Sequence, residues 1–479
     1  MNDSMACADL GIFNISKSPD SSFWSLDSNG KVPTANDASD LSAIFSDYIY
    51  LTGFWAVADI SVPTYNYSDL SKNSEKTTLM LAKGAQSDSI DMKEALFVYA
   101  NASDVGTGGL GLGLDNSGSA DSNFISNFVR AGLIDSNSYS LALSPSNSSH
   151  PELILGGVST DKYNGDLCSF DFIPVQDESG AIVTSNNGYT DSLPVVPISG
   201  FGVTSNSSGK SLLFSNSYDD KISESNYPKP ALIDSRTYYN YLPFSTLIEI
   251  AVELNAYYAE SLDSWIVDCD AGKSGTVDVY LGNVSINMNI SNILYPAHDD
   301  NNTELYFTDG DQACFLALLP DYQVGYSILG TPFLRHAYMA VDNEGKQLAL
   351  GKAVVYGDTG NNSIAKSDGD HSLYPISSGS IPFAKPNNVT DYTGLTLTIP
   401  ATINITGNIS MTSDVIISNG EVFIATGQEP LTNSRTSTVS ESTAKASGYS
   451  STHNNVGPQE FPQMWSLAAS IFGVIIAML

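Results

Sequence analysis

The sequence predicts an all-β protein with a large core, from the spacing of its apolar runs and from its hydrophobic content. Short runs rich in Val, Ile, Tyr, Phe and Thr recur between clusters of Gly, Asn, Asp and Ser; examples are 54–62, 138–144, 152–157, 276–282 and 346–355. Runs of this length between turn residues are typical of strands. Hydrophobic residues make up 42% of the 479 residues, enough for a large core.

Two segments predict helices within this strand-rich chain. In 122–134 and in 244–256, apolar residues recur three or four positions apart and so share one helical face. The segment 176–195 is rich in Gly and Asn and is expected to be a loop between two lobes. After residue 355 the composition shifts to Gly, Asn, Ser and Asp, and 393–425 alternates Thr, Ile and Val, which predicts a small additional β segment.

These changes in composition divide the chain into five expected parts. They are an N-terminal lobe at 1–190, a C-terminal lobe at 191–355, a partly β segment at 356–430, a disordered Ser/Thr-rich stalk at 431–457 and a processing tail at 458–479.

The charge balance excludes one class of partner. Asp and Glu number 52 against 20 Lys and Arg, giving a net charge of -32. Nucleic-acid binding needs clustered cations, so we expect no nucleic-acid partner. The four cysteines show no CxxC spacing and the five histidines are scattered, so the sequence predicts no metal site and no cofactor.

The C-terminus has the three parts of a GPI-anchor signal. A stretch of small and polar residues at 432–457 precedes a polar spacer at 458–463 and an uncharged apolar run at 464–479. That run is shorter than the ~20 residues of a membrane-spanning helix, and the order of the parts is that of a GPI signal. The other interpretations are a tail-anchor helix or an amphipathic helix. The expected attachment residues are Ser450, Asn454 and Asn455.

GPI attachment would place the protein outside the cell, at the plasma membrane or cell wall. Recurring N-x-S/T sequons, such as those at Asn206 and Asn283, agree with a secreted glycoprotein. Residues 1–18, however, show neither the basic nor the apolar region of a signal peptide. We therefore expect that Met1 is not the true start, or that the sequence is a fragment or a decayed gene.

Several motifs, taken in order, are similar to those of one protein family. In 230–243 an apolar strand leads to Asp-Ser at a turn, and 326–353 contains an apolar-apolar-Gly run. The segments 45–60, 105–116 and 124–167 match a flap hairpin, an apolar-Gly segment and a helix-to-strand segment. This order resembles the pepsin-like aspartic proteases. With the GPI tail and stalk, the chain is most similar to the fungal yapsins, which cut at basic residues.

The resemblance implies a bilobal pepsin-like fold with an incomplete N-terminal lobe. It implies polypeptide substrates and a monomer, with Asp234 as the catalytic carboxylate of the second lobe. Cys269 and Cys314 occupy the positions of the C-lobe disulfide, whereas Cys168 has no obvious partner. The flap is placed at 45–55. The implied substrate-binding positions are Phe45, Ser46, Asp47, Ser235 and Thr237.

The chain departs from the family pattern at the flap, where Phe45 stands in place of Tyr and Ser46 and Tyr48 in place of Gly, and at both catalytic motifs. Arg236 stands where the family has Gly, which lets the backbone crowd against the carboxylate. An arginine there either places a cation beside Asp234, opposing proton sharing, or points to solvent and distorts the turn. The first-lobe Asp-Thr-Gly should precede Cys7 and is absent from the sequence as written.

The family's chemistry needs two carboxylates that share a proton. We therefore expect that the polypeptide as written does not cleave peptides. Two hypotheses stay open: a surface protease whose sequence is clipped at its start, and a non-catalytic GPI-anchored cell-wall or binding glycoprotein derived from that fold. A wall glycoprotein unrelated to proteolysis is a third, weaker hypothesis.

Overall fold

The protein is described here by a computed structural model. It covers residues 22–23, 41–44, 50–63, 78–81, 89–103, 109–113, 124–143, 151–177, 179–180, 193–214, 227–299, 302–354, 373–389, 392, 394–400 and 415–424. For the strands within 22–103 it gives the backbone pairing, with side-chain environments at Ala58 and Asp59.

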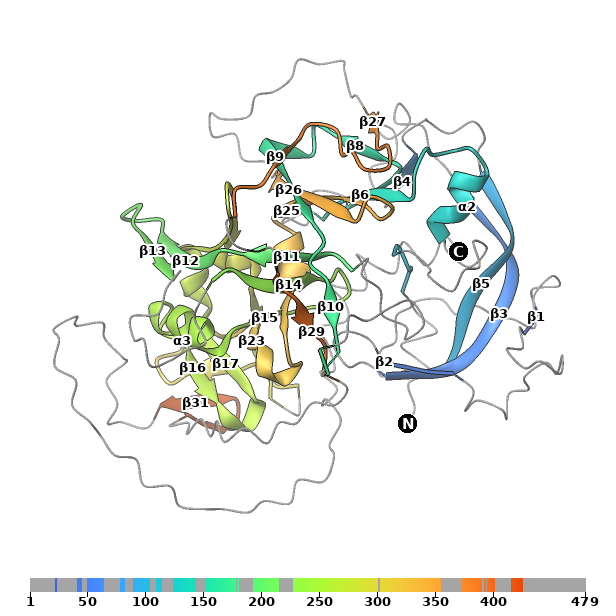
Figure 1. Ribbon diagram of the computed structural model, residues 1–479. Coiled ribbons are helices and arrows are strands. Elements are labelled where there is room, and N and C mark those ends of the chain that lie inside the picture. Colours follow the sequence, from blue (N-terminus) through green and yellow to red (C-terminus); the bar gives the residue numbers. More distant parts are fainter. Residues whose placement is uncertain are drawn as a thin grey trace.

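The most N-terminal sheet is built on two long strands. β3 (Tyr50–Pro63) and β5 (Ser89–Ser103) pair antiparallel, and β1 (Ser22–Phe23) and β2 (Leu41–Ile44) add to β3. Together β3 and β5 form the curved blue ribbon at the right of Figure 1. β2 and β3 run antiparallel with Ile44 opposite Tyr50, as a hairpin requires.

A seven-stranded sheet joins segments from far apart in the sequence. Its order is β28-β9-β26-β25-β6-β7-β4. β25 and β26 belong to the range expected for the C-terminal lobe, yet they pair with β6 and β9 from the range expected for the N-terminal lobe. Strands from both sides of residue 190 therefore share one sheet, and the division into two lobes at this residue stays a prediction. The strands are β4 (Thr78–Leu81), β6 (Ser138–Ala142), β7 (Glu152–Leu155), β9 (Tyr163–Asp171), β25 (Ala337–Asp342), β26 (Gln347–Ala353) and β28 (Ala384–Pro386).

The remaining described strands form smaller sheets, mostly in the green and yellow body at the left of Figure 1. The sheet that carries Asp234 contains β11 (Val195–Ile198), β14 (Lys229–Ile233), β24 (Ser327–Leu329), β15 (Asn240–Leu242) and β23 (Leu318–Pro320). A second contains β13 (Ser211–Phe214), β12 (Gly200–Ser205), β18 (Gly275–Leu281) and β19 (Val284–Asn289). A third contains β16 (Tyr257–Ala259), β17 (Ser264–Asp268), β22 (Ala313–Leu316) and β20 (Leu294–Pro296).

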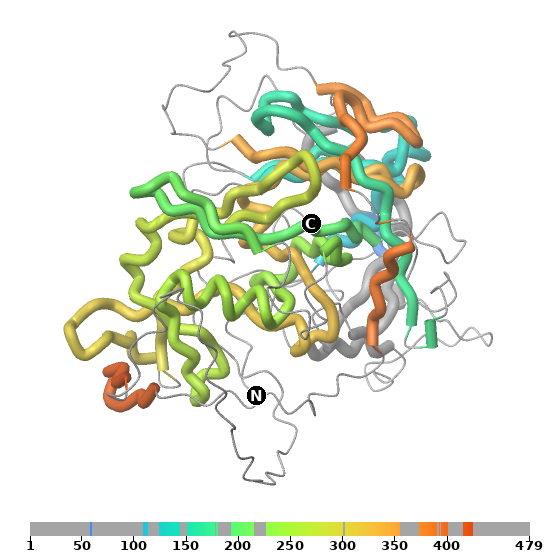
Figure 2. The backbone as a smooth tube through the Cα atoms, turned by 60° about the vertical axis from the view of Figure 1, so that its left-hand side comes forward, coloured from blue at the N-terminus to red at the C-terminus, as the bar shows by residue number. Residues whose placement is uncertain are grey.

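The segment after residue 355 adds strands to the edges of several of these units. β27 (Leu373–Pro375) pairs with β8 (Gly157–Ser159), and β29 (Leu397–Thr398) pairs with β10 (Val175–Gln176). β30 (Val415–Ser418) and β31 (Glu421–Ile424) join β21 (Tyr306–Phe307). Figure 2 shows these orange and red stretches lying against different parts of the body. The described part of this segment is thus integrated into the fold.

Both predicted helices are present, and one of them is shorter than expected. α3 (Phe244–Glu253) buries Leu247, Ile250 and Ala251 on one face. α2 (Phe124–Arg130) is shorter than the apolar run that predicted it, because Gly132 adopts a left-handed φ of 72° and the N–H of Leu133 bonds back to Phe128 O. A short helix, α4 (Thr331–Leu334), and 3₁₀ turns at Glu260–Leu262, Cys269–Lys273, Ile290–Asn292 and Asp321–Gln323 complete the described helical segments.

No helix among the described residues is both long and apolar enough to cross a membrane.

Candidate active site

Asp234 follows directly after β14, the strand that the 230–243 motif predicted. β14 lies between β11, to which it is antiparallel, and β24, to which it is parallel. The parallel ladder continues one step past the strand, because the N–H of Asp234 donates to Leu329 O at 3.1 Å. The partly buried Asp234 side chain therefore starts from a backbone that the sheet holds in place.

Two donors of the turn orient the Asp234 carboxylate. The N–H of Arg236 donates to Oδ1 at 2.9 Å, and the hydroxyl of Thr237 donates to Oδ2 at 3.0 Å. Thr237 is 2% exposed, so its hydroxyl is held inside the protein. Of the implied binding positions, Ser235 and Thr237 thus form one turn with Asp234, and Thr237 contacts the carboxylate.

A second segment crosses behind this turn and fixes its backbone. The N–H and the hydroxyl of Thr331 both donate to Thr237 O, at 2.7 and 2.9 Å, and the N–H of Gly330 donates to Asn240 Oδ1 at 2.8 Å. A Cβ at Gly330 would lie 2.1 Å from Tyr239 O. Only glycine fits this close approach.

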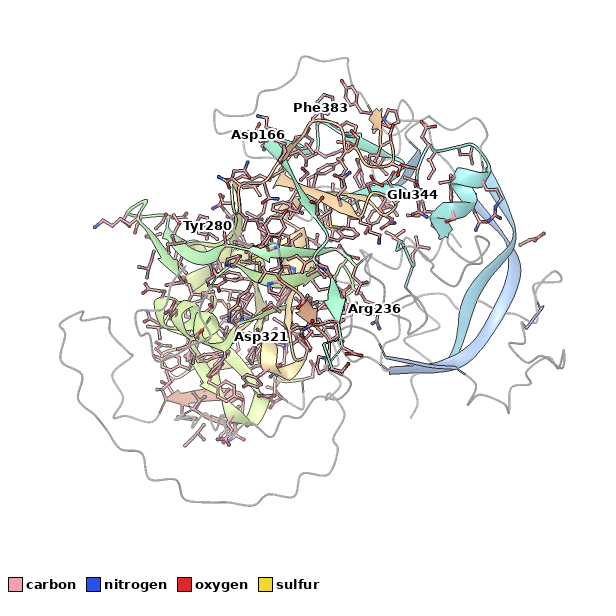
Figure 3. All side chains as sticks on the ribbon, viewed as in Figure 1. Asp166, Arg236, Tyr280, Asp321, Glu344 and Phe383 are labelled. Carbon is pink, nitrogen blue, oxygen red and sulfur yellow. A yellow bond between two sulfur atoms is a disulfide. The ribbon has the colours of Figure 1, made fainter. Side chains whose placement is uncertain are left out.

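Arg236 contacts Asp234 through its main chain. In Figure 3 Arg236 lies at the right-hand edge of the green and yellow body. The N–H bond to Oδ1 needs no glycine, so the turn accepts an arginine without losing this contact. That the guanidinium crowds or pairs with the carboxylate stays a prediction.

Tyr139 is a neighbour that the sequence did not single out. It lies on β6, and burial raises the pKa of its phenol well above the usual range, with the negative charge of Asp234 raising it further. Tyr139 lies opposite Val341 on the neighbouring strand β25 of the seven-stranded sheet. In the sequence it is one aromatic residue in an ordinary strand pattern. Its proximity to the charge of Asp234 follows only from the tertiary fold.

The predicted flap residues Phe45, Ser46 and Asp47 lie outside the described residues. So do the proposed lipid-attachment residues Ser450, Asn454 and Asn455. Within the described part of the chain, no group of three or more His, Cys, Asp or Glu side chains could hold a metal ion.

The cysteines have different environments. Cys269 and Cys314 form a disulfide with 5.0 Å between their Cα atoms, the pairing that the resemblance implied. Cys168 is a buried free thiol on β9, and its Sγ donates to Asn283 Oδ1 at 2.7 Å. Burial raises the pKa of the Cys168 thiol to about 11, which makes a reactive thiolate scarce at neutral pH. Cys7 lies outside the described residues.

Comparison with known families shows which family the chain belongs to. The family model for eukaryotic aspartyl proteases matches residues 79–353, more than half of the chain and the whole Asp234 region. The chain belongs to the eukaryotic aspartyl protease family. The predicted resemblance and the all-β fold class are therefore confirmed.

Fungal aspartyl proteases are among the similar proteins. Aspartic proteinase yapsin-7 of Saccharomyces cerevisiae is 31% identical over 364 residues, covering 69% of this chain and 58% of that protein. Aspartic proteinase 3 of the same yeast is 26% identical over 385 residues, covering 77% of this chain and 56% of that protein. A probable aspartic-type endopeptidase opsB of Aspergillus oryzae is 27% identical over 256 residues, covering 53% and 47%. The chain thus spans less than two thirds of each of these relatives.

Proposed function

We propose that this protein is a yapsin-like aspartic endopeptidase of the fungal cell surface whose catalysis is impaired by the Asp-Ser-Arg sequence at 234–236. The observation that carries the proposal is the Asp234 turn. Its carboxylate is oriented by Arg236 N–H and Thr237 Oγ1, and its backbone is fixed by Leu329, as a catalytic carboxylate requires. Polypeptides, including those with basic sites, are the proposed substrates, and the proposed form is a monomer.

In the proposed reaction Asp234 works with a second carboxylate from the other lobe. One carboxylate, ionised, takes a proton from water, and the water oxygen adds to the peptide carbonyl carbon. The other, protonated, donates to the carbonyl oxygen. Collapse of the intermediate breaks the C–N bond, and the leaving nitrogen takes a proton. Of the two carboxylates, Asp234 lies among the described residues, and the other is the one that the family's first-lobe Asp-Thr-Gly would supply.

Arg236 supports the proposal of impairment. A guanidinium beside the pair favours two negative charges over one shared proton, and the shared proton is what allows one carboxylate to act as an acid. The same residue supports the second candidate function, a non-catalytic binding glycoprotein of the cell wall. GPI anchoring after the 431–457 stalk belongs to both candidates and rests on the sequence pattern.

Peptide cleavage distinguishes these candidates. The substrate contains paired basic residues, and the assay runs at mildly acidic pH with and without a transition-state-mimicking inhibitor of aspartic proteases. Four proteins are compared: the chain, its Arg236→Gly variant, and both again with an N-terminal segment added that carries the Asp-Thr-Gly motif implied by the family resemblance. Asp234→Asn in the most active of them is the matched control.

Between the two extended proteins, we expect stronger inhibitor-sensitive cleavage by the Arg236→Gly variant than by the form that keeps Arg236, and its loss on Asp234→Asn. Robust inhibitor-sensitive cleavage by the unmodified chain, or equal cleavage by the two extended proteins, contradicts the impairment. No cleavage by any of the four folded proteins supports the binding glycoprotein. Release of the mature protein from fungal membranes by a phosphatidylinositol-specific phospholipase tests the anchor separately. Retention with an intact apolar tail would instead indicate a tail anchor.

A further inference from the structure

Residues 394–400, which we call the C-terminal brace, lie beyond the 79–353 region that the family model matches. They are nevertheless built into the fold. The N–H of Leu397 donates to Pro174 O at 2.9 Å and the N–H of Ile399 donates to Gln176 O at 3.0 Å, so the brace runs parallel to β10. Figure 2 shows this orange-red stretch beside the green stretch that contains β10.

The brace covers one face of the strand that carries Asp234. On β14, Ala231 and Ile233 face the main core, whereas Leu232 faces a separate apolar cluster. Leu232 is paired with Ile328 on β24, and Ile328 faces the same cluster. Leu397 and Ile399 belong to this cluster and are 2% and 7% exposed. The brace therefore helps to bury the side of β14 and β24 that faces away from the main core.

Pro400 extends the contact to the backbone that enters β24. Gly325 has a φ of 86°, and a Cβ placed there would lie 2.4 Å from Cγ of Pro400. The turn before β24 thus fits directly under the end of the brace. Since β24 supplies Leu329 O to the N–H of Asp234, the brace supports both strands of the ladder that holds the turn.

We propose that Leu397 and Ile399 are positioning residues for Asp234, acting through β14 and β24. The name positioning residue rests on the proposed catalytic role of Asp234. The packing of the brace against β14 and β24 does not depend on that role. Truncating Leu397 opens a cavity behind Leu232 and Ile328, and the surrounding strands relax into such a cavity only in part. The β14–β24 ladder then opens more often, and the Asp234 turn loses its fixed geometry.

Amide hydrogen exchange followed by mass spectrometry tests the proposal without any need for cleavage. The variants are Leu397→Ala, the milder Ile399→Val and the conservative Leu397→Met. Ile416→Ala is the matched control, because Ile416 is 61% exposed in the same C-terminal segment. The peptides to follow cover 229–239 and 327–334, and the reference peptides cover 264–268 and 313–316, in the sheet next to the disulfide.

For Leu397→Ala we expect exchange at least ~10-fold faster in 229–239 and 327–334, with the reference peptides unchanged. Ile399→Val should give a smaller change at the same places, and Leu397→Met and Ile416→Ala almost none. Equal acceleration of all peptides, or unchanged protection of 229–239 in both Leu397→Ala and Ile399→Val, overturns the proposal. Since exchange is measured in the chain alone, a failure of the cleavage assay does not affect this result.

Discussion

The hydroxyl of Thr237 donates to Oδ2 of Asp234, while the carbonyl of the same threonine accepts both donors of Thr331. One buried residue thus links the carboxylate to the segment that crosses behind it. Because of this arrangement, we expect a substitution at one of these positions to alter the geometry of the others.

Replacing the Thr237 hydroxyl tests this link. Thr237→Val keeps the shape but removes the donor to Asp234, and we expect the free energy of unfolding to fall by about 1–2 kcal/mol. Thr237→Ser keeps the donor and should lose less. Urea unfolding followed by tryptophan fluorescence measures both variants. Equal losses for valine and serine would show that the methyl group, and not the hydrogen bond, carries the effect.

Gly330 is expected to be intolerant of any side chain. An added Cβ would lie 2.1 Å from Tyr239 O and 2.5 Å from Thr237 O, so the backbone must shift. We expect Gly330→Ala to destabilise the protein by about 3 kcal/mol. The control is Gly111→Ala, since a Cβ at Gly111 meets nothing within 4 Å. Thermal unfolding of the two variants should differ clearly, and similar melting temperatures would contradict the close approach.

His336 is expected to make stability depend on pH. Burial lowers the pKa of His336 to about 4, with a contribution from the charge of Arg335, against an opposing effect of the bond to Pro332 O. The neutral ring uses Nδ1 to donate to Pro332 O, and Nε2 to accept from the N–H of Asn289 and the amide of Asn292.

Because the unfolded chain binds the histidine proton at higher pH than the folded chain, acid favours unfolding. Between pH 6.5 and pH 4 the His336 contribution should cost about 3 kcal/mol of stability. His336→Gln cannot titrate, so its disadvantage relative to the unmodified chain should shrink as the pH falls. Urea unfolding at pH 7, 5.5 and 4 gives this comparison. A constant difference across the three pH values would rule out a neutral buried ring.

The Cys269–Cys314 disulfide should contribute substantially to stability. It closes a loop with a sequence separation of 45, for which chain entropy predicts a loss of about 4 kcal/mol on removal. The double variant Cys269→Ala/Cys314→Ala is compared with Cys168→Ala, which removes the free thiol. Denaturant unfolding with and without reductant provides the measurement. A reductant effect on the double variant as large as that on the unmodified chain would point to another disulfide.

The local parts of the fold and site could be predicted from the sequence. Turn residues between β-branched runs predicted strands, and the 230–243 motif predicted the Asp234 turn, because both depend on neighbours in the chain. The helix at 122–134 was predicted too long, because its apolar pattern continues past the left-handed Gly132.

The long-range contacts could not be predicted in this way. The negative charge of Asp234 acts on Tyr139 of the seven-stranded sheet. Leu397 joins the apolar cluster of Leu232 because β29 pairs with β10. An alternating pattern shows that a residue is buried, but not which distant strand buries it. The pairing of β25 and β26 with β6 and β9 was missed for the same reason.

That pairing has a consequence for biosynthesis. The amide of Asn343, at the turn after β25, donates to Asn137 Oδ1, 206 residues earlier in the chain. As a chain emerges from the ribosome, one edge of β6 and one edge of β9 stay unpaired until β25 and β26 have been made, which needs most of the polypeptide. Closing so large a loop is slow, and exposed edges invite association with other chains. Ribosome-bound chains that end before residue 337 should therefore recruit chaperones strongly, and chains that extend past 353 should release them.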